Sequence, residues 1–341
     1  MIVEKRVFGK TFDGTEVYAY TLQNKNSITI EVINYGGIVT RLYVPDRNGK
    51  LTDIVLGRNS LEEYLDNPDY IGAIIGRNAG KVVNGEIDIF GHIVKVSKNK
   101  GEDCQHGGFE GFDKKIWSVT EYNDGITLSY TSSDGEEGFP GKLSVDVTYT
   151  LTDNDVFRIE YNAVSDKDTV CNLTNHSYFN LNGHGTGKVY EQEIEMNCDF
   201  FVAGEKKNVI ASVLGTPLDL RTAKKLGENI NSDHKEISMW GGFDHHLIVN
   251  GEGFRKCAKA VSVETGISME VYTNQPVVVL YSANFLNEGT YKDGKHYGPH
   301  HAFCLETQSY PSEKLTEYSG RLLKKGQKYS HITEYRFALI D

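Results

Sequence analysis

Asn-Leu-Thr-Asn-His-Ser-Tyr-Phe-Asn, residues 172–180, predicts a β-strand with one unusually polar face. Strand side chains alternate between two faces, so every second residue points to the same side. One face of this segment would carry Asn172, Thr174, His176, Tyr178 and Asn180. In an ordinary all-β core these positions would be apolar, because burying such groups dry is costly. We therefore expect this face to line a concave site that hydrogen-bonds a polar ligand.

A second strand-like segment, His-Ala-Phe-Cys-Leu-Glu-Thr-Gln at residues 301–308, has a similar character near the other end of the chain. The alternation places Cys304, Glu306 and Gln308 on a common face. A carboxylate in the middle of a strand needs a partner or a ligand, because its burial alone is unfavourable. His176 and Glu306 are therefore the candidate catalytic residues.

Alternating apolar and polar residues extend over most of the chain and predict an all-β protein. Further candidate strands are residues 27–32, 38–44, 126–131, 143–151, 156–164, 169–181, 258–263, 268–273, 277–282, 302–308 and 328–340. Turn signals separate them, at residues 34–37, 123–125 and 153–155. Residues 60–65 and 222–230 are the candidates for short helices. So many strands with so few helices predict a large antiparallel β-sandwich in a single domain, residues 1–341.

The composition limits the classes of partner and the cellular compartment. The chain has 341 residues, with 36 Lys and Arg against 47 Asp and Glu, and a net charge of −11. This balance opposes binding to nucleic acid or to an anionic membrane, since both need a basic surface. The first residues lack the apolar stretch of a signal peptide, and no segment has the length to span a bilayer. Five scattered cysteines without a Cys-x-x-Cys pair indicate reduced thiols in a cytoplasmic protein.

Three other polar segments could bring loops to a site. They are Gly-Arg-Asn-Ala-Gly-Lys at residues 76–81, His-Gly-Gly at 106–108 and Gly-Gly-Phe-Asp-His-His at 241–246. Glycine beside such residues lets the backbone and a ligand approach closely. Each segment taken alone carries little weight, because ordinary turns have the same composition.

The histidine pairs do not predict a catalytic metal. His245 and His246 are adjacent, as are His300 and His301, and neighbours on a strand point to opposite faces. The sequence contains no His-Glu-x-x-His motif and no cysteine pair that would support a zinc site. We therefore expect these four histidines to be structural and the site to hold no metal.

Two other chemistries have to be weighed against a sugar site. The sequence has no Gly-x-Ser-x-Gly elbow, and a carboxylate at Glu306 would raise rather than lower the pKa of a thiol at Cys304, which argues against a nucleophile. A glycosidase with Asp244 and Glu306 on either side of a sugar stays open. A sugar-binding module without catalysis also stays open, although it would not need a Glu–His pair.

One carboxylate together with a histidine on a β-sheet suits proton transfer to and from a sugar. Opening a cyclic hemiacetal needs a base for the anomeric hydroxyl and an acid for the ring oxygen as the C1–O5 bond breaks. Reference pKa values of roughly 4.3 for Glu and 6.5 for His suit a base and an acid near neutrality. Rotation of the free aldehyde and reclosure gives the other anomer without a cofactor.

The motifs together resemble those of the galactose mutarotase (aldose 1-epimerase) family. The segments that carry the resemblance are residues 106–108, 134–141 (Asp-Gly-Glu-Glu-Gly-Phe-Pro-Gly), 172–181, 242–245 and 303–308, in the order of the family. They span nearly the whole chain. The resemblance implies the galactose mutarotase β-sandwich and interconversion of the α- and β-anomers of free hexoses such as galactose and glucose. It also implies that no metal or cofactor takes part.

The resemblance also assigns roles to individual residues. Glu306 would be the general base and His176 the general acid. His106 would hydrogen-bond near the ring oxygen and the anomeric centre, Asp244 would hold sugar hydroxyls, and Tyr178 would also bind substrate. The partner would be a small-molecule aldose, bound by a monomer or a homodimer.

Two positions depart from the family pattern. The family commonly has Gly-Arg-x-Ala-Asn-Arg, whose last arginine contacts the sugar, whereas this chain has Gly80 and Lys81 there. Lys81 keeps the charge but lacks the planar guanidinium fork; we expect Lys81 and Arg77 to bind substrate. Val279 stands where some members have Gln. The preferred sugar therefore stays open between galactose, glucose and a disaccharide such as maltose.

Overall fold

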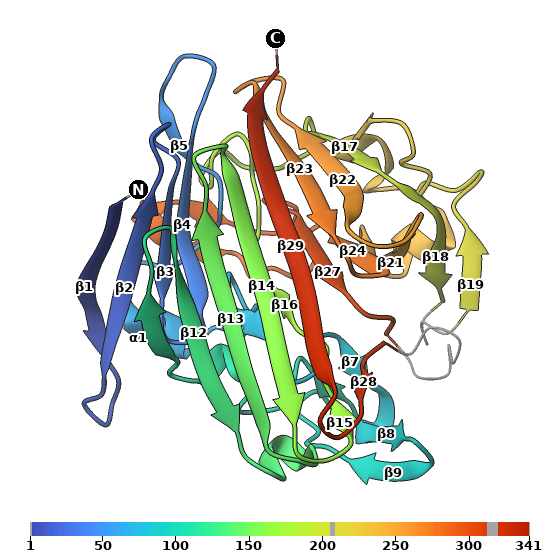
Figure 1. Ribbon diagram of the computed structural model, residues 1–341. Coiled ribbons are helices and arrows are strands. Elements are labelled where there is room, and N and C mark those ends of the chain that lie inside the picture. Colours follow the sequence, from blue (N-terminus) through green and yellow to red (C-terminus); the bar gives the residue numbers. More distant parts are fainter. Residues whose placement is uncertain (1, 205–208, 312–319, 341) are drawn as a thin grey trace.

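The computed structural model describes residues 2–204, 209–311 and 320–340 (Figure 1). Within these ranges the strands form one nine-stranded sheet, two five-stranded sheets and several two-stranded pairs, and every pairing between strands is antiparallel. The predicted all-β fold with large antiparallel sheets is confirmed.

The nine-stranded sheet occupies the front of Figure 1. Its strands, in spatial order, are β11 (Ser118–Glu121), β12 (Gly125–Ser132), β13 (Leu143–Leu151), β14 (Val156–Ser165), β29 (Lys328–Leu339), β23 (Ile267–Thr273), β22 (Arg255–Val261), β17 (Glu193–Met196) and β20 (Lys224–Lys225). Strand β13 shows why the pattern folds this way, since each of its odd-numbered residues from Leu143 to Leu151 is buried.

The two five-stranded sheets lie behind the large one. The first contains β1 (Ile2–Lys10), β2 (Glu16–Gln23), β3 (Thr29–Ile33), β4 (Ile38–Pro45) and β5 (Leu51–Asp53). The second, which carries the site, runs in the order β19 (Val209–Ser212), β18 (Cys198–Ala203), β21 (Asp244–Val249), β24 (Val277–Tyr281) and β27 (Cys304–Gln308). A common core joins all three sheets and includes Leu42, Val145 and Leu247.

Short strand pairs and helices complete the described chain. The pairs are β6 (Ile74–Ile75) with β16 (Thr174–Asn175), β7 (Lys81–Val82) with β10 (Cys104–Gln105), β8 (Glu86–Ile89) with β9 (His92–Lys95), β15 (Thr169–Val170) with β28 (Leu322–Leu323), and β25 (Gly289–Thr290) with β26 (His296–Tyr297). The 3-10 helices are η1 (Val83–Gly85), η2 (Phe112–Lys114), η3 (Glu136–Gly138) and η4 (Lys292–Gly294).

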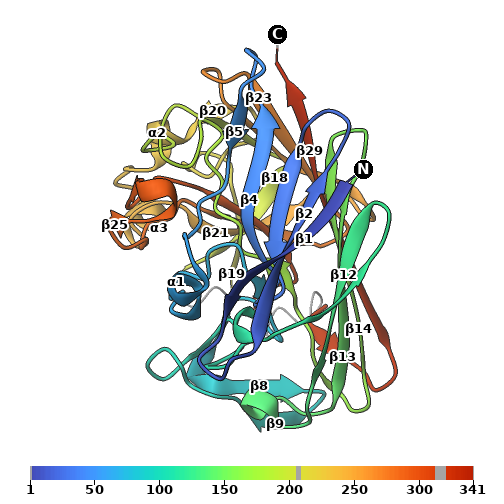
Figure 2. The same cartoon turned by 90° about the vertical axis from the view of Figure 1, so that its left-hand side faces the viewer.

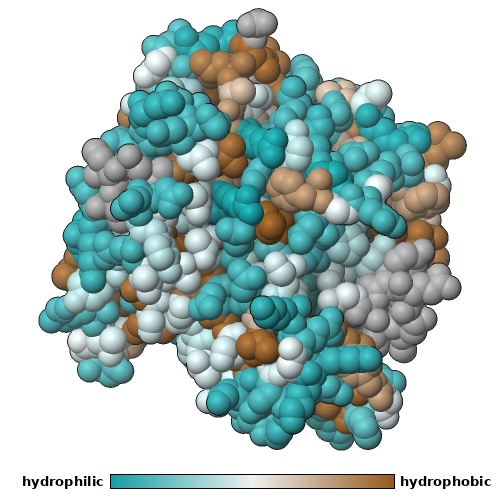
Figure 3. Space-filling view, viewed as in Figure 1, coloured by the Kyte–Doolittle hydropathy of each residue, from teal (hydrophilic) through white to brown (hydrophobic). Residues whose placement is uncertain are grey.

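The α-helices within the described ranges are short and lie on the side opposite β12, β13 and β14 (Figure 2). They are α1 (Leu61–Leu65), α2 (Leu226–Asn229) and α3 (Lys235–Ser238). Helix α1 begins after Ser60, whose hydroxyl accepts a hydrogen bond from the backbone of Glu63, as its capping sequence predicts. Of the helices in the described ranges, none has the length and apolar character to cross a membrane. The face seen in Figure 3 is covered mainly by hydrophilic residues.

Residues 169–181 do not form the single strand that the sequence predicts. This segment forms only two short strands, β15 and β16, and its backbone bonds to several separate parts of the chain. The amide of Asn172 donates to the carbonyl of Arg77, and the amide of His176 donates to that of Ala73. Further along, the amide of Asn180 donates to the carbonyl of Ile54. The backbone is therefore satisfied by many partners instead of one ladder.

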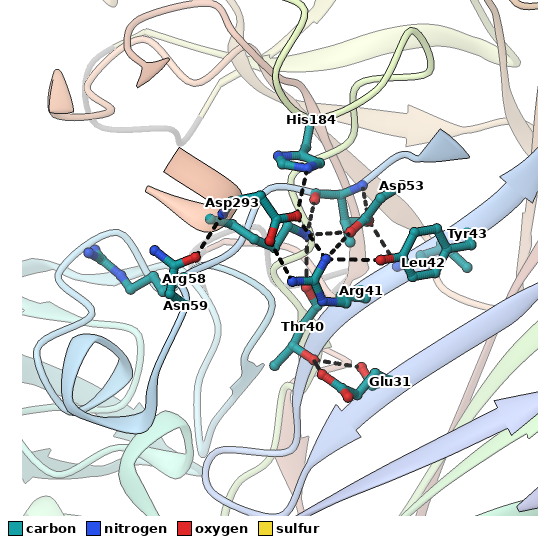
Figure 4. Close-up of polar contacts among 12 residues, drawn as sticks. Glu31, Thr40, Arg41, Leu42, Tyr43, Asp53, Arg58, Asn59, His184 and Asp293 are labelled. Carbon is teal, nitrogen blue, oxygen red and sulfur yellow. Dashed lines mark hydrogen bonds and ion pairs between the residues drawn. The ribbon is translucent and has the colours of Figure 1, made fainter. Parts of the chain in front are cut away.

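A buried charge network fixes the chain that precedes β27 (Figure 4). The ammonium of Lys292, which is fully buried, lies 2.8 Å from the carboxylate of Asp53. Next to it, Arg41 binds both carboxylate oxygens of Asp293 at 2.8 and 2.9 Å, and His184 Nε2 lies 3.4 Å from the same carboxylate. These contacts attach η4 to strands β4 and β5.

Candidate active site

A cavity of about 890 Å³ opens over the second five-stranded sheet. Its floor is formed by one face of three neighbouring strands, β21, β24 and β27, with side chains of Asp244, His246, Val279, Tyr281, Glu306 and Gln308. The opposite side includes residues of β7, β8 and β9 and the loop that ends in His106. A cavity of this size with a few convergent polar groups is typical of a small-molecule site.

His176 and Glu306 meet at the floor of this cavity. His176 Nε2 lies 3.7 Å from Glu306 Oε1, although 130 positions separate the two residues in the sequence. Both side chains are nearly completely buried, and both line the cavity. The alternation that placed Glu306 on the polar face of its strand is confirmed, because Val279, its partner across the ladder, lines the cavity too.

Aromatic rings surround the imidazole of His176. The ring of Tyr178 stacks on it at 5.0 Å between centroids, and those of Tyr70 and Tyr281 lie at 6.3 Å. The His106 ring meets it edge-on at 5.4 Å. Burial among these groups lowers the pKa of His176 to about 4, so the ring is neutral near pH 7 in the unliganded protein.

Cys304 lies on the other side of the His176 ring. Its Sγ is 3.7 Å from His176 Nδ1, and the residue is completely buried. Burial, and then the carboxylates of Glu306 and Asp244, raise the pKa of this thiol far above its usual range. The expectation that Cys304 is no nucleophile agrees with that direction.

His106 presents one ring nitrogen to the backbone and lines the cavity with its ring. The amide of Gly80 donates to Nδ1 of His106 at 3.2 Å. Because Nδ1 accepts this bond, the neutral ring carries its hydrogen on Nε2 and can donate it. His106 lines the cavity, as do Asp244, Tyr178 and Lys81. The sequence predicted five substrate-binding residues around the catalytic pair. The structure brings four of them together at the cavity, and the fifth is Arg77.

Arg77 does not line the cavity. Its guanidinium is buried and donates to the Ser132 hydroxyl, to the carbonyls of Ser133 and Pro140, and to the Thr169 hydroxyl. The five donors of the guanidinium are used to hold the segments around β12 and β15 together. The expected substrate contact of Arg77 is therefore corrected to a structural role.

Lys81 lies at the rim of the cavity. Its side chain is 44% exposed, and its ammonium forms an ion pair with Asp103 at 3.1 Å. The position of Lys81 allows it to reach a bound ligand, while Asp103 limits its freedom.

One histidine of the two adjacent pairs belongs to the site. His246 lines the cavity, whereas His245 points to the other side of β21, where its ring contacts Phe201. His300 lies between the Tyr190 hydroxyl and a backbone carbonyl. The expectation that all four are structural is therefore wrong for His246, although the alternation of neighbouring residues on the strand holds.

Several cavity residues have no signal in the sequence. Tyr70 contacts the His106 ring at 4.7 Å, and Trp240 and Phe285 also line the cavity. Tyr70 and Trp240 come from turns, and no periodic pattern marks such positions. The polar face expected of residues 172–180 is also divided, because the amides of Asn172 and Asn180 bond to backbone groups away from the cavity.

A buried histidine outside the cavity connects the two catalytic segments. His331 Nδ1 lies 3.1 Å from the carbonyl of Leu173, and its Nε2 lies 2.9 Å from the hydroxyl of Thr307. A carbonyl can only accept, so Nδ1 carries the hydrogen and Nε2 accepts from the hydroxyl. Leu173 precedes His176 by three residues and Thr307 follows Glu306, so the ring spans from one catalytic segment to the other.

Among the described residues, one group of side chains could hold a metal ion. One ligand atom each from His176, Cys304 and Glu306 lies within 4.8 Å of the other two. The sequence did not reveal this group, because His176 is far from the other two residues along the chain.

Comparison with known proteins finds one matching family and several relatives that are similar over nearly the whole chain. Residues 18–336 match the family described as Aldose 1-epimerase. The chain is 38% identical to galactose mutarotase of Bos taurus over 99% of both chains. It is 33% identical to aldose 1-epimerase of Haemophilus influenzae, over 95% of this chain and 97% of the relative.

Solved structures have the same architecture. Galactose 1-epimerase from Lactobacillus acidophilus superposes with a TM-score of 0.87 and 26% identity, over the whole of this chain and 99% of the other. A GalM/aldose epimerase homologue from C. elegans also gives 0.87, at 28% identity, over 94% of this chain and 98% of the other.

Proposed function

The chain belongs to the aldose 1-epimerase family and interconverts the α- and β-anomers of aldoses, and we propose that Glu306 and His176 perform this reaction as general base and general acid. The observation that carries the assignment is the distance of 3.7 Å between His176 Nε2 and Glu306 Oε1 on the floor of the cavity. A base and an acid must both reach the anomeric region of one sugar, and these two groups do so from different segments.

The reaction balances without an external reagent. The carboxylate of Glu306 removes the proton of the C1 hydroxyl, the C1–O5 bond breaks, and the ring oxygen takes a proton from His176. The open-chain aldehyde then rotates about its C1–C2 bond. Reclosure from the other face returns both protons, so the enzyme ends in its starting state.

We propose that the protonation of His176 is linked to the charge on Glu306, because Nε2 lies 3.7 Å from the carboxylate. Burial favours the neutral imidazole, whereas nearby Asp244 favours the protonated ring. In the active form His176 is protonated and Glu306 is ionised. The alternative form, with a neutral His176 and a protonated Glu306, contains the same total number of protons. We propose that the proton is shared within the pair and reaches His176 when a sugar is bound.

The remaining cavity residues would bind the sugar. His106 would donate from Nε2 to an oxygen near the anomeric centre, and the Asp244 carboxylate would accept from sugar hydroxyls. Tyr178 and Lys81 would add further contacts. Galactose is a proposed substrate, since mammalian relatives at 36–38% identity have the name galactose mutarotase. Glucose is proposed beside it as a free hexose of the same class.

A cytoplasmic location is also part of the proposal. All five cysteines are reduced and buried, as expected for a protein of a reducing compartment. The acidic balance of the sequence favours neither nucleic acid nor an anionic membrane as partner.

Substitution of each member of the pair tests the assignment. Glu306→Gln keeps the shape of the side chain, His176→Asn keeps a polar side chain of smaller size, and both remove the proton transfer. Each should lower kcat for anomerisation of α-glucose and α-galactose by about 10²–10⁴, measured by polarimetry. The double variant should lose much less than the product of the single losses, because paired catalytic groups are not additive.

His184→Asn is the matched control, because His184 is a buried histidine bonded to Tyr297 and outside the cavity. It should retain kcat. Single variants of Glu306 and His176 that keep near-normal kcat and native circular dichroism would contradict the assignment. Such a result would favour the alternative of a sugar-binding module with these residues in its pocket.

A further inference from the structure

Three donor atoms of different chemical type converge beneath the sugar site. They belong to His176, Cys304 and Glu306, which supply an imidazole nitrogen, a thiol sulfur and a carboxylate oxygen. His176 Nδ1 lies 3.7 Å from Sγ, and Nε2 lies 3.7 Å from Oε1. Anomerisation by acid–base chemistry uses the nitrogen and the oxygen, but it gives the thiol no role.

The spacing of these atoms suits a tetrahedral cation. Zinc binds sulfur at about 2.3 Å and nitrogen or carboxylate oxygen at roughly 2.0–2.2 Å, so donors around one ion lie roughly 3.3–3.7 Å apart. One atom from each residue already lies within 4.8 Å of the other two, so side-chain rotations of the imidazole and the carboxylate would bring the set to bonding distance of one ion. A mixed sulfur, nitrogen and oxygen set favours zinc, cobalt or copper over magnesium or calcium.

We propose that His176, Cys304 and Glu306 form a site for a soft or borderline divalent cation such as Zn²⁺, and that the bound ion inhibits the enzyme. Three protein ligands leave one coordination position open, and that position faces the cavity through which the ion enters. Asp244 lines the same cavity and adds negative charge that attracts the ion.

Inhibition follows from the atoms that the ion uses. Coordination uses the one free lone pair of the neutral imidazole and a lone pair of the carboxylate, and the thiol proton leaves to solvent. The ring can then no longer take up the second proton that it must deliver to O5, and the bound carboxylate can no longer remove the proton from O1. The ion and the sugar therefore exclude each other. This inhibitory part rests on the proposed roles of Glu306 and His176, whereas the binding of the ion does not.

Cobalt provides a direct probe of the site. Co²⁺ added to the chelator-treated full chain should give intense visible bands of tetrahedral cobalt and a near-ultraviolet thiolate-to-metal charge-transfer band. Cys304→Ser should lose the charge-transfer band and at least about tenfold of the affinity. Cys171→Ser should keep both, because Cys171 is equally buried but lies outside the group. Glu306→Gln, which retains the thiol, should keep the charge-transfer band with weaker binding.

Zn²⁺ inhibition of anomerisation completes the test. Zinc should raise KM without lowering kcat, a chelator should restore the rate, and Cys304→Ser should raise the inhibition constant at least about tenfold. Absence of the charge-transfer band, or an affinity that is independent of Cys304, would overturn the site. A full cobalt spectrum together with uninhibited anomerisation would overturn the inhibitory part. Failure of the metal-free protein to anomerise sugars would instead contradict the proposed roles of the pair, and the cobalt spectrum would remain to decide the site.

Discussion

His176 is held neutral by the rings packed around it. Its pKa is lowered to about 4 by burial, whereas the pKa of an exposed histidine lies near 6.5. The proposed acid must carry a proton, so the fraction of active enzyme should rise as the pH falls, until Glu306 is protonated. We predict that kcat/KM, which reports the free enzyme, loses activity on the alkaline side with an apparent pKa below 6.5. Polarimetric rates between pH 4 and pH 9 measure this limb.

The same pH series compares the free enzyme, which kcat/KM reports, with the enzyme–sugar complex, which kcat reports. If the proton reaches His176 when sugar binds, the alkaline limb of kcat should lie at higher pH than that of kcat/KM. An alkaline limb of kcat/KM at or above pH 6.5 would contradict a depressed histidine as the acid. In Glu306→Gln the coupling partner is lost, and the alkaline limb should move further toward acid pH.

Lys81 should contribute to sugar binding more than to proton transfer. Its ammonium lies at the cavity rim and pairs with Asp103. A rim contact is equally strong in the bound sugar and in the transition state, so Lys81→Ala should raise KM by about tenfold with little change in kcat. Lys81→Arg should be tolerated, since the longer side chain keeps the charge.

Lys98→Ala is the matched control for Lys81, because Lys98 forms an exposed ion pair with Glu102 outside the cavity. It should leave both kinetic constants unchanged. An unaltered KM in Lys81→Ala for every sugar tested would mean that the ammonium does not reach the ligand.

At the scale of the residue, the sequence predicted the side chains that chemistry makes unusual in a strand. His176 and Glu306 could be found because a charged or titratable group in a strand has few structural reasons to be there. Arg77 could not be separated from Lys81, because its partners Ser132 and Thr169 are more than 50 positions away. The difference between His245 and His246 depends on which face of β21 meets the cavity, and the sequence does not give that face.

Strands β27 and β29 and the segment at residues 172–180 are joined at His331. Its ring bonds to Leu173 on one side and to Thr307 on the other, and it stacks on Tyr161 at 4.6 Å. Loss of the ring would remove the donor to the buried carbonyl of Leu173 and the link to the Thr307 hydroxyl, and it would let the two segments shift. A displacement of about 1 Å can cost 10²-fold in rate, so His331→Leu should lower kcat by roughly 10- to 100-fold with a smaller change in KM.

Positioning can be separated from simple destabilisation. His331→Gln retains a donor and an acceptor and should recover much of kcat. His184→Leu is the control, since it also removes a buried histidine but joins no catalytic segments. His331 has only a structural role if His331→Leu lowers the melting temperature as much as His184→Leu does but shows a normal kcat when assayed well below that temperature.

Regular elements could be predicted from the sequence, and irregular ones could not. Strand β13 has the predicted bounds at both ends, because its alternation is strict and turn residues flank it. Residues 169–181 have the composition of a strand, but their backbone partners come from Arg77, Ala73 and Ile54. Such bonds are tertiary, and local sequence carries no information on them.

Across the whole molecule, buried histidines and a buried carboxyl have opposite effects on how the stability of the fold changes with pH. Burial lowers the pKa of His331 to about 3 and that of His176 to about 4, so the stability they contribute is present above pH 6.5 and is lost as the pH falls toward those values. Asp113 behaves in the opposite way. Burial raises its pKa to about 7, so its contribution is present below pH 3.8 and is lost as the pH rises to 7.

The balance of these groups can be measured through Asp113. At pH 8 Asp113 is ionised and buried in the folded protein. Burying a neutral amide of the same shape costs less free energy than burying this carboxylate. Each unit of pKa shift corresponds to about 1.4 kcal/mol, so Asp113→Asn should increase the free energy of unfolding by a few kcal/mol at pH 8. At pH 5 the carboxyl is already protonated in the folded wild type, and the gain should largely disappear.

Removal of Asp113 should also expose the effect of the histidines. Between pH 7 and pH 5 the two histidines each cost the folded state about 2 kcal/mol, and Asp113 offsets part of that sum in the wild type. Urea unfolding at pH 7 and pH 5 should therefore show a loss of stability toward acid pH that is about 2 kcal/mol larger for Asp113→Asn than for the wild type. Parallel pH dependences for the two proteins would mean that Asp113 titrates near its ordinary value, and that the buried histidines alone determine the acid response.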